Sequence, residues 1–118
     1  MNLRETILAK NDLHQESIHV PEWDTDVIVK TMTAGQRSDM LDKCIDKNKK
    51  NPELDSKKLY IYTVIYCAYD PTTDKPIFTE ADYDALRGKS SNALEIILTA
   101  ANRINALGED EVKKLEKN

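Results

Sequence analysis

Two short alternating runs in residues 14–32, separated by a bend that holds the only tryptophan, limit the fold of this chain most strongly. The apolar residues that recur at every other position are Ile18, Val20, Val27 and Val29. Such alternation gives a strand one apolar face. Pro21 cannot donate to a strand ladder, and Trp23 is a large amphipathic ring at the bend. We therefore predict a β-hairpin that packs on helices or on a partner, because two strands alone are marginal in water.

Length and charge exclude several classes of protein. A chain of 118 residues suits one domain, which would bury roughly 65% of the surface that its unfolded form exposes. The net charge of −4 and the absence of a basic stripe argue against nucleic-acid binding. No apolar run approaches the ~20 residues that span a bilayer, and the N-terminus does not have the order of a secretory signal. We therefore expect no membrane span and no export.

Helix signals follow the hairpin. Thr33 and Gln36 have the spacing of a capping box, and the apolar spacing after them predicts an amphipathic helix to about residue 48. Residues 48–56 are polar, contain a proline and are interpreted as a connector. A short helix is also predicted at the N-terminus, from a capping Asn2 to about residue 11.

Residues 59–69 are almost continuously apolar or aromatic and are compatible with either a buried helix or a strand. We favour a helix, since one face would be apolar and a second, half-polar face would carry tyrosines. A turn over residues 70–76 follows, and Ile77 and Phe78 could lie back against the preceding element. Thr79 would then cap a helix that ends at Gly88.

The last predicted helix begins at Ser90 or Ser91 and is the longest. Its apolar residues recur at helical spacing, and Gly108 offers a left-handed C-cap. The fold class is therefore α+β, an N-terminal hairpin packed on a bundle of roughly four helices. Residues 1–108 would form the single domain, and residues 109–118 a charged tail that is helical or frayed.

Catalytic and metal-binding patterns do not emerge from the sequence. His14 and His19 are an odd number of residues apart, which turns them to opposite faces of a strand. Cys44 and Cys67 lack metal-ligand spacing and are expected to be buried, reduced thiols. The carboxylates of residues 70–81 lack the glycine and the final glutamate of a calcium loop. No phosphate-binding loop and no nucleophile with its base is apparent, so we predict no enzyme, no cofactor and no metal.

Aromatic residues in amphipathic positions are what remains. Four of the five tyrosines crowd residues 60–69, more than a small core easily satisfies through their hydroxyls. In one interpretation, the tyrosines lie at the edge of the core with their hydroxyls in water. In the other, they form a protein-binding face, since tyrosine is favoured at interfaces. The candidate protein-binding residues are Trp23, Tyr62, Tyr66 and Tyr69.

The order of the segments also carries a resemblance. From the N-terminus there are a short helix, V-P-E-W at residues 20–23, T-A-G-Q-R-S-D at 33–39, I-F-T-E-A-D at 77–82 and K-S-S-N-A-L at 89–94. In this order and spacing the chain resembles the tail assembly chaperones of long-tailed, siphovirus-type bacteriophages. Asp24 stands where such proteins often carry glycine after the tryptophan.

The resemblance implies a non-enzymatic protein that stays in the host cytoplasm and is absent from the mature virion. It implies binding to the tape measure protein, a very long and partly apolar helical chain, and its delivery to the tail tube protein. Self-association is a further possibility. The terminal Lys117-Asn118 fits an A-AAA-AAC slip site for a frameshifted longer form, or is an ordinary charged terminus.

Two alternatives stay open at this point. A small structural virion protein, such as a head–tail connector or tail completion protein, would also be α+β and without catalytic residues. A small regulatory or enzyme-inhibiting module is the other alternative, since fold alone does not fix function.

Overall fold

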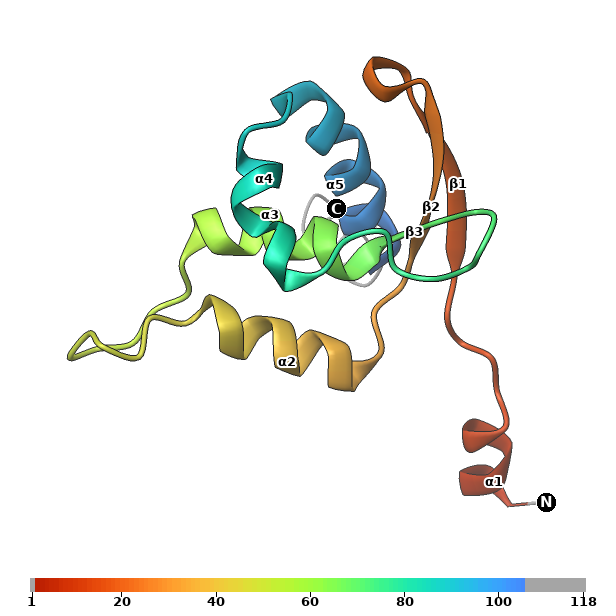
Figure 1. The fold of residues 1–118 in the computed structure, drawn as a ribbon. Coiled ribbons are helices and arrows are strands. Elements are labelled where there is room, and N and C mark those ends of the chain that lie inside the picture. Colours follow the sequence, from red (N-terminus) through yellow and green to blue (C-terminus); the bar gives the residue numbers. More distant parts are fainter. Residues whose placement is uncertain (1, 106–118) are drawn as a thin grey trace, which may run out of the picture.

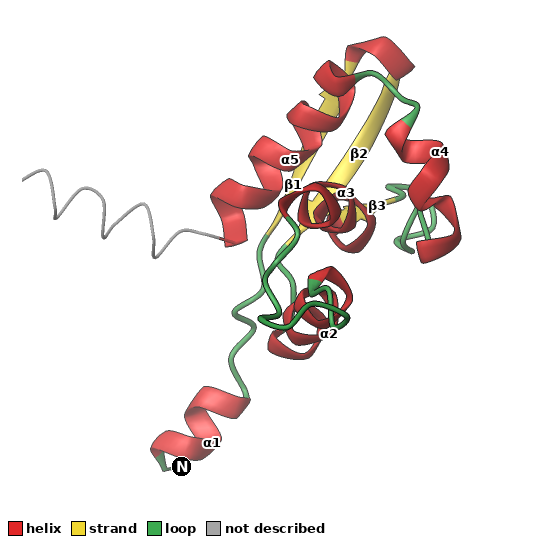
Figure 2. Cartoon of the chain, turned by 90° about the vertical axis from the view of Figure 1, so that its left-hand side faces the viewer, coloured by secondary structure: helices red, strands yellow, loops and turns green. Residues whose placement is uncertain are grey.

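The computed structural model describes residues 2–105, and its α+β architecture confirms the predicted fold class. In chain order the elements are α1 (Leu3–Leu8), β1 (Gln15–Val20), the 3₁₀ turn η1 (Pro21–Trp23), β2 (Thr25–Lys30), α2 (Ala34–Cys44), α3 (Ser56–Cys67), β3 (Ala68–Tyr69), the 3₁₀ turn η2 (Glu80–Asp82), α4 (Tyr83–Arg87) and α5 (Ser91–Asn105). α3 and α5 pack side by side and against the sheet, and α2 packs on α3 away from it (Figures 1 and 2).

The hairpin forms as predicted. β1 and β2 pair antiparallel, with Val20 opposite Thr25 at the closed end. Val20, Val27 and Val29 face the core with at most 1% of their surface exposed, as the alternation requires. Asp24 closes the bend with φ of 48°, in the left-handed region where aspartate is tolerated more readily than most residues and glycine costs least.

The sheet has three strands rather than the two of a simple hairpin. Residues 68–69, predicted as the end of a helix, leave the helix and form β3, which pairs antiparallel with β2. Ile28 lies opposite Tyr69 in this pairing. Ile77 then donates its backbone N–H to the Ala68 carbonyl at 3.1 Å, so the segment after the turn lies back on β3 as expected.

α3 is the central element of the core. The prediction of a helix over most of residues 59–69 is confirmed, since the helix runs to Cys67. Every residue from Ile61 to Ile65 is buried, so the helix is covered on all sides rather than on one face. The Asp55 carboxylate caps its first turn by accepting hydrogen bonds from the backbone N–H groups of Lys57 and Lys58.

α2 begins as predicted but ends earlier. Thr33 and Gln36 form both hydrogen bonds of the capping box, at 3.1 and 2.9 Å. The helix ends at Cys44 instead of near residue 48, because Ile45 is extended and pairs with Leu54 in an isolated β-bridge. The Asp55 N–H also donates to the Cys44 carbonyl at 2.8 Å, so the two ends of the connector lie side by side.

The helix predicted to begin after Thr79 starts as a 3₁₀ turn and becomes α-helical only at Tyr83, whereas its end at Gly88 is as predicted. Thr79 and Asp82 form a second capping box at η2, which leads into α4, and Gly88 ends α4. α5 begins at Ser91, and its core-facing residue Ile97 is fully buried. The predicted cap at Gly108 and the tail at residues 109–118 lie outside the described residues.

α1 stands apart from the rest of the described chain (Figures 1 and 2). Asn2 caps it, as predicted, by accepting a hydrogen bond from the Glu5 N–H at 2.8 Å. The helix ends at Leu8 rather than near residue 11, and Leu3, Ile7 and Leu8 are more than half exposed. Among residues 2–105, no helix is long and apolar enough to cross a membrane.

Asn105 joins the end of α5 to the junction between β2 and α2. Its Oδ1 accepts a hydrogen bond from the Met32 N–H at 2.7 Å, and its Nδ2 donates to the Ala101 carbonyl at 2.8 Å. Nδ2 also lies 3.7 Å from the Cys67 Sγ. Cys67 and Cys44 are buried free thiols, as predicted, and burial raises the pKa of Cys67 to about 12.

We expect Asn105→Ala to lower the free energy of unfolding by about 1–2 kcal/mol, because the Met32 N–H loses its partner in a partly buried place. Urea unfolding measures the change. Asn102→Ala is the matched control on the exposed face of the same helix and should cost less than about 0.5 kcal/mol. Equal losses in the two variants would contradict the assigned role of Asn105.

Candidate functional site

The structure brings three of the four candidate residues into one hollow. Tyr62, Tyr66 and Tyr69 line a cavity of about 210 Å³ together with Phe78 and Pro76. We call this cavity the aromatic hollow. Tyr62 and Tyr66 lie one helical turn apart on α3, whereas Tyr69 reaches the same place from β3 rather than from the helix.

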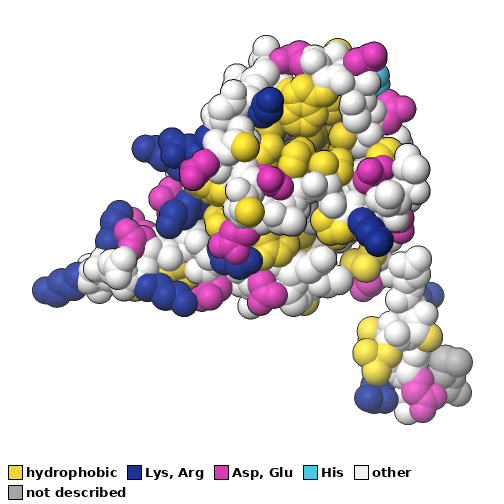
Figure 3. Space-filling model, viewed as in Figure 1, with side chains coloured by type: hydrophobic (Ala, Val, Ile, Leu, Met, Phe, Trp, Pro, Cys, Tyr) yellow, Lys and Arg dark blue, Asp and Glu magenta, His cyan; other side chains and the backbone are white. Residues whose placement is uncertain are grey.

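Trp23 joins the aromatic hollow through Phe78. The two ring centroids lie 6.4 Å apart with an interplanar angle of 72°, an edge-to-face contact. Tyr62 stacks on Tyr83 of α4 at 5.2 Å with a tilt of 38°. Figure 3 shows hydrophobic side chains gathered on this face, between the hairpin and α4. The half-buried rings of Trp23, Phe78 and Tyr83 thus extend the hollow into a continuous apolar surface.

The tyrosine side chains of the aromatic hollow already have polar partners. The Tyr62 hydroxyl donates to the Glu80 carboxylate at 3.1 Å, and the side-chain amide of Gln36 donates to the Tyr69 hydroxyl at 3.4 Å. The Lys30 ammonium lies 4.5 Å from the centroid of the Tyr69 ring. The Tyr62 and Tyr69 hydroxyls therefore both have a side-chain partner beside the hollow.

Charge around the aromatic hollow is balanced in pairs. Lys43 lies 3.1 Å from the Glu80 carboxylate and 5.5 Å from the centroid of the Tyr66 ring. The Tyr66 and Glu80 side chains raise the pKa of Lys43, and hydrogen bonds from Lys43 and Tyr62 lower the pKa of Glu80. Burial, and then the bond to Glu80, raises the pKa of Tyr62. At neutral pH the rim of the hollow therefore carries the Lys43–Glu80 ion pair beside the aromatic rings.

The candidate residues differ in exposure. Tyr62 is 8% exposed and belongs to the core, whereas Trp23, Tyr66 and Tyr69 are half-buried. Phe78 was not among the predicted residues, although it links Trp23 to the tyrosines. The available signal was the expectation that Ile77 and Phe78 lie back on the preceding element, which places the only phenylalanine beside the tyrosines.

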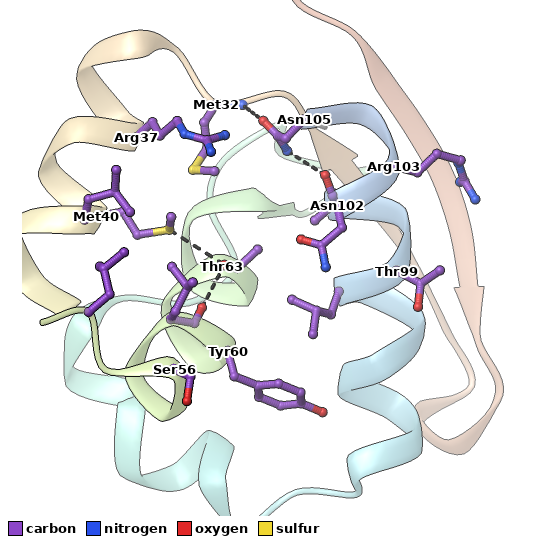
Figure 4. Close-up of a pocket in the computed structure, with 15 residues that line it drawn as sticks. Met32, Arg37, Met40, Ser56, Tyr60, Thr63, Thr99, Asn102, Arg103 and Asn105 are labelled. Carbon is purple, nitrogen blue, oxygen red and sulfur yellow. Dashed lines mark hydrogen bonds between the residues drawn. The ribbon is translucent and has the colours of Figure 1, made fainter. Parts of the chain in front are cut away.

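A larger open hollow of about 720 Å³ lies between α2, α3 and α5 (Figure 4). Met32, Arg37, Met40 and Tyr60 line it, and Asn102 and Asn105 close one side. Of the candidate residues, none lies there. Within the described range, no group of three or more His, Cys, Asp or Glu residues is placed to hold a metal ion.

A search of solved structures found the tail assembly chaperone of bacteriophage HK97, with a TM-score of 0.51 and 18% sequence identity. The likeness covers 87% of this chain and 93% of that chain. No model of a protein family matches the chain, and a search of curated proteins found no match either. At this identity the likeness shows a shared fold.

We expect Tyr62→Phe to lower the free energy of unfolding at pH 7 by about 1 kcal/mol, because a partly buried hydroxyl loses its hydrogen bond to the Glu80 carboxylate. Since the pKa of Glu80 is lowered in the folded state, this stabilisation is complete above the ordinary glutamate pKa and is lost as the pH falls through the folded value. The difference in the free energy of unfolding between Tyr62→Phe and the unaltered protein should therefore become smaller as the pH is lowered.

Tyr83→Phe is the matched control, because the Tyr83 hydroxyl makes no side-chain hydrogen bond within residues 2–105 and its ring contact is kept. Urea unfolding at several pH values compares the two variants. The assignment fails if Tyr83→Phe costs as much as Tyr62→Phe, or if the cost does not depend on pH.

Proposed function

We propose that this chain is a tail assembly chaperone of a long-tailed bacteriophage. It binds the tape measure protein, keeps that chain soluble and helps to recruit tail tube subunits. It acts in the host cytoplasm without enzymatic activity and is not retained in the mature virion. The observation that supports this most is the fold shared with the HK97 tail assembly chaperone over most of both chains. The order of sequence motifs supports it independently.

The aromatic hollow and Trp23 are the proposed contact surface for the tape measure protein. A long, partly apolar helix needs a partner that covers its apolar stripes reversibly. Trp23, Phe78 and Tyr66 offer broad ring surface with few rotatable bonds, which loses little conformational entropy on binding. The Lys43–Glu80 pair at the rim keeps this surface hydrated when no client is bound.

Release is part of the proposal. The aromatic hollow measures only about 210 Å³, so it does not enclose a client side chain deeply. A client would instead be bound through the apolar area that it buries against the rings. Affinity would then depend on repeated contacts along a long client. Tail tube subunits that polymerise around the client can displace such contacts one at a time.

We expect Trp23→Ala and Tyr66→Ala each to weaken tape measure binding by about 2 kcal/mol, roughly thirtyfold in affinity. On co-expression, the soluble fraction of the tape measure protein should fall several-fold compared with the unaltered chaperone. Tyr60→Ala is the matched control, since Tyr60 is a half-buried tyrosine of the same helix that lines the other hollow.

Circular dichroism must show that each variant is folded. If folded Trp23→Ala and Tyr66→Ala proteins keep the tape measure protein soluble as well as Tyr60→Ala does, the contact surface is wrong. Detection of this chain in purified phage particles would instead favour a structural virion protein, such as a head–tail connector or tail completion protein.

A further inference from the structure

α1 has an apolar side that the described part of the chain leaves exposed. Leu3 and Ile7 lie one helical turn apart with Leu8 beside them, and these side chains are 73%, 58% and 68% exposed. A helix of six residues is not stable alone in water, even with the Asn2 cap, because few hydrogen bonds offset the entropy lost in fixing its first turn. The helix therefore needs a surface that covers this apolar side.

The open hollow between α2, α3 and α5 is a surface of matching chemistry. α2 and α5 both pack on α3 and leave a volume of about 720 Å³ between them. Figure 4 shows that side chains from all three helices surround it. Leucine and methionine make up the apolar part of its lining, namely Met32, Met40, Leu41, Leu54, Leu59 and Leu98. Leu54 is 51% exposed. A short helix can insert its apolar side chains into such a groove between helices.

The linker from α1 to β1 is anchored beside the open hollow. The His14 N–H donates to the Thr31 hydroxyl at 3.2 Å, and the Thr31 N–H donates to the His14 carbonyl at 2.9 Å. The next residue, Met32, lines the hollow, and its N–H donates to Asn105, which lines it too. Residues 9–13 span at most ~17 Å when extended. α1 is therefore held near the hollow, and Figure 2 shows it below α2 and the end of α5, two of the helices that flank the hollow.

This short tether favours a contact within one chain. A segment on a short flexible linker meets a site on its own chain at an effective concentration in the millimolar range. Docking within a chain also loses less translational and rotational freedom than the association of two molecules. α1 therefore binds the open hollow of its own chain in preference to the same surface on another molecule.

We propose that α1 is a strap that closes over the open hollow of its own chain. Leu3, Ile7 and Leu8 then lie against the leucine and methionine side chains, so two exposed apolar surfaces are covered together. The Arg4 stem runs along the same surface and keeps its guanidinium in water. The chain thus has an open state, drawn in Figures 1 and 2, and a closed state in which neither surface is available to other molecules. This inference does not depend on the proposed function.

Paramagnetic relaxation measured by NMR tests the proposal on the full chain. Glu5→Cys places a nitroxide label on the side of α1 opposite Leu3 and Ile7, and the two native cysteines are buried and should not react. If α1 closes, the label should remove the amide signals of residues 37–41 and 98–102, which flank the open hollow. The amide signals of residues 21–24, at the far end of the hairpin, should remain (Figure 1).

Leu8→Asp, added to the labelled chain, puts a charge into the proposed contact and should restore the lost signals. It should also speed the exchange of the Ile7 amide with solvent by about tenfold or more, because the helix loses its cover. Leu13→Asp is the matched control, since it makes the same change at an exposed leucine of the linker outside α1. It should leave both measurements unchanged. The amide spectrum itself shows that each variant is folded.

Three results would overturn the proposal. One is that the label leaves the signals of residues 37–41 and 98–102 intact, and another is that Leu8→Asp and Leu13→Asp give equal results. The third comes from a mixture of isotope-labelled chain without nitroxide and unlabelled chain that carries it. Signal loss as large in this mixture as within one chain would place α1 on another molecule. None of these results bears on tape measure binding, which the Trp23 and Tyr66 variants test separately.

Discussion

The structure depends on the need to bury one helix on all of its sides. From Ile61 to Ile65, α3 is buried around its whole circumference, and Thr63 is the one polar side chain among four apolar or aromatic ones. Exposed to water, each such side chain would cost about 1.5–3 kcal/mol. The sheet, α2, α4 and α5 are the elements that cover it. Surfaces for contact with other molecules must therefore come from the outer faces of these elements and from the half-buried side chains of α3, such as Tyr66.

The tyrosines of α3 contribute both to the core and to the aromatic hollow. Tyr62 points into the core and ends at Glu80, while Tyr66, one turn later, is half exposed beside Lys43. The same helix therefore supplies core packing at one position and contact surface at the next. Phe78, returned to the sheet by the turn after β3, joins these rings to Trp23. The resulting surface suits reversible contacts with another polypeptide, as the proposed function requires.

The parts of the fold that depend on neighbouring residues could be predicted from the sequence, whereas those that depend on contacts between distant residues could not. The capping box at Thr33, the alternation of the hairpin and the helical spacing of α5 each lie within a few residues and were confirmed. The short β3 and the bridge between Ile45 and Leu54 depend on backbone partners that sequence periodicity does not report. For the candidate site, the sequence indicated the tyrosines and Trp23. Phe78 was not included, although Ile77 and Phe78 were expected to lie back on the preceding element, because its contact with Trp23 depends on how the turn folds.

Hydrogen exchange on this chain, measured with and without the tape measure protein, tests the central claim most directly. The account predicts that binding slows amide exchange around residues 21–24 and 76–83, which flank Trp23 and the aromatic hollow, and leaves residues 45–55 of the connector unchanged. Two results would contradict this account. One is slowed exchange only in other parts of the chain, and the other is no slowed exchange anywhere in the chain although the tape measure protein stays soluble.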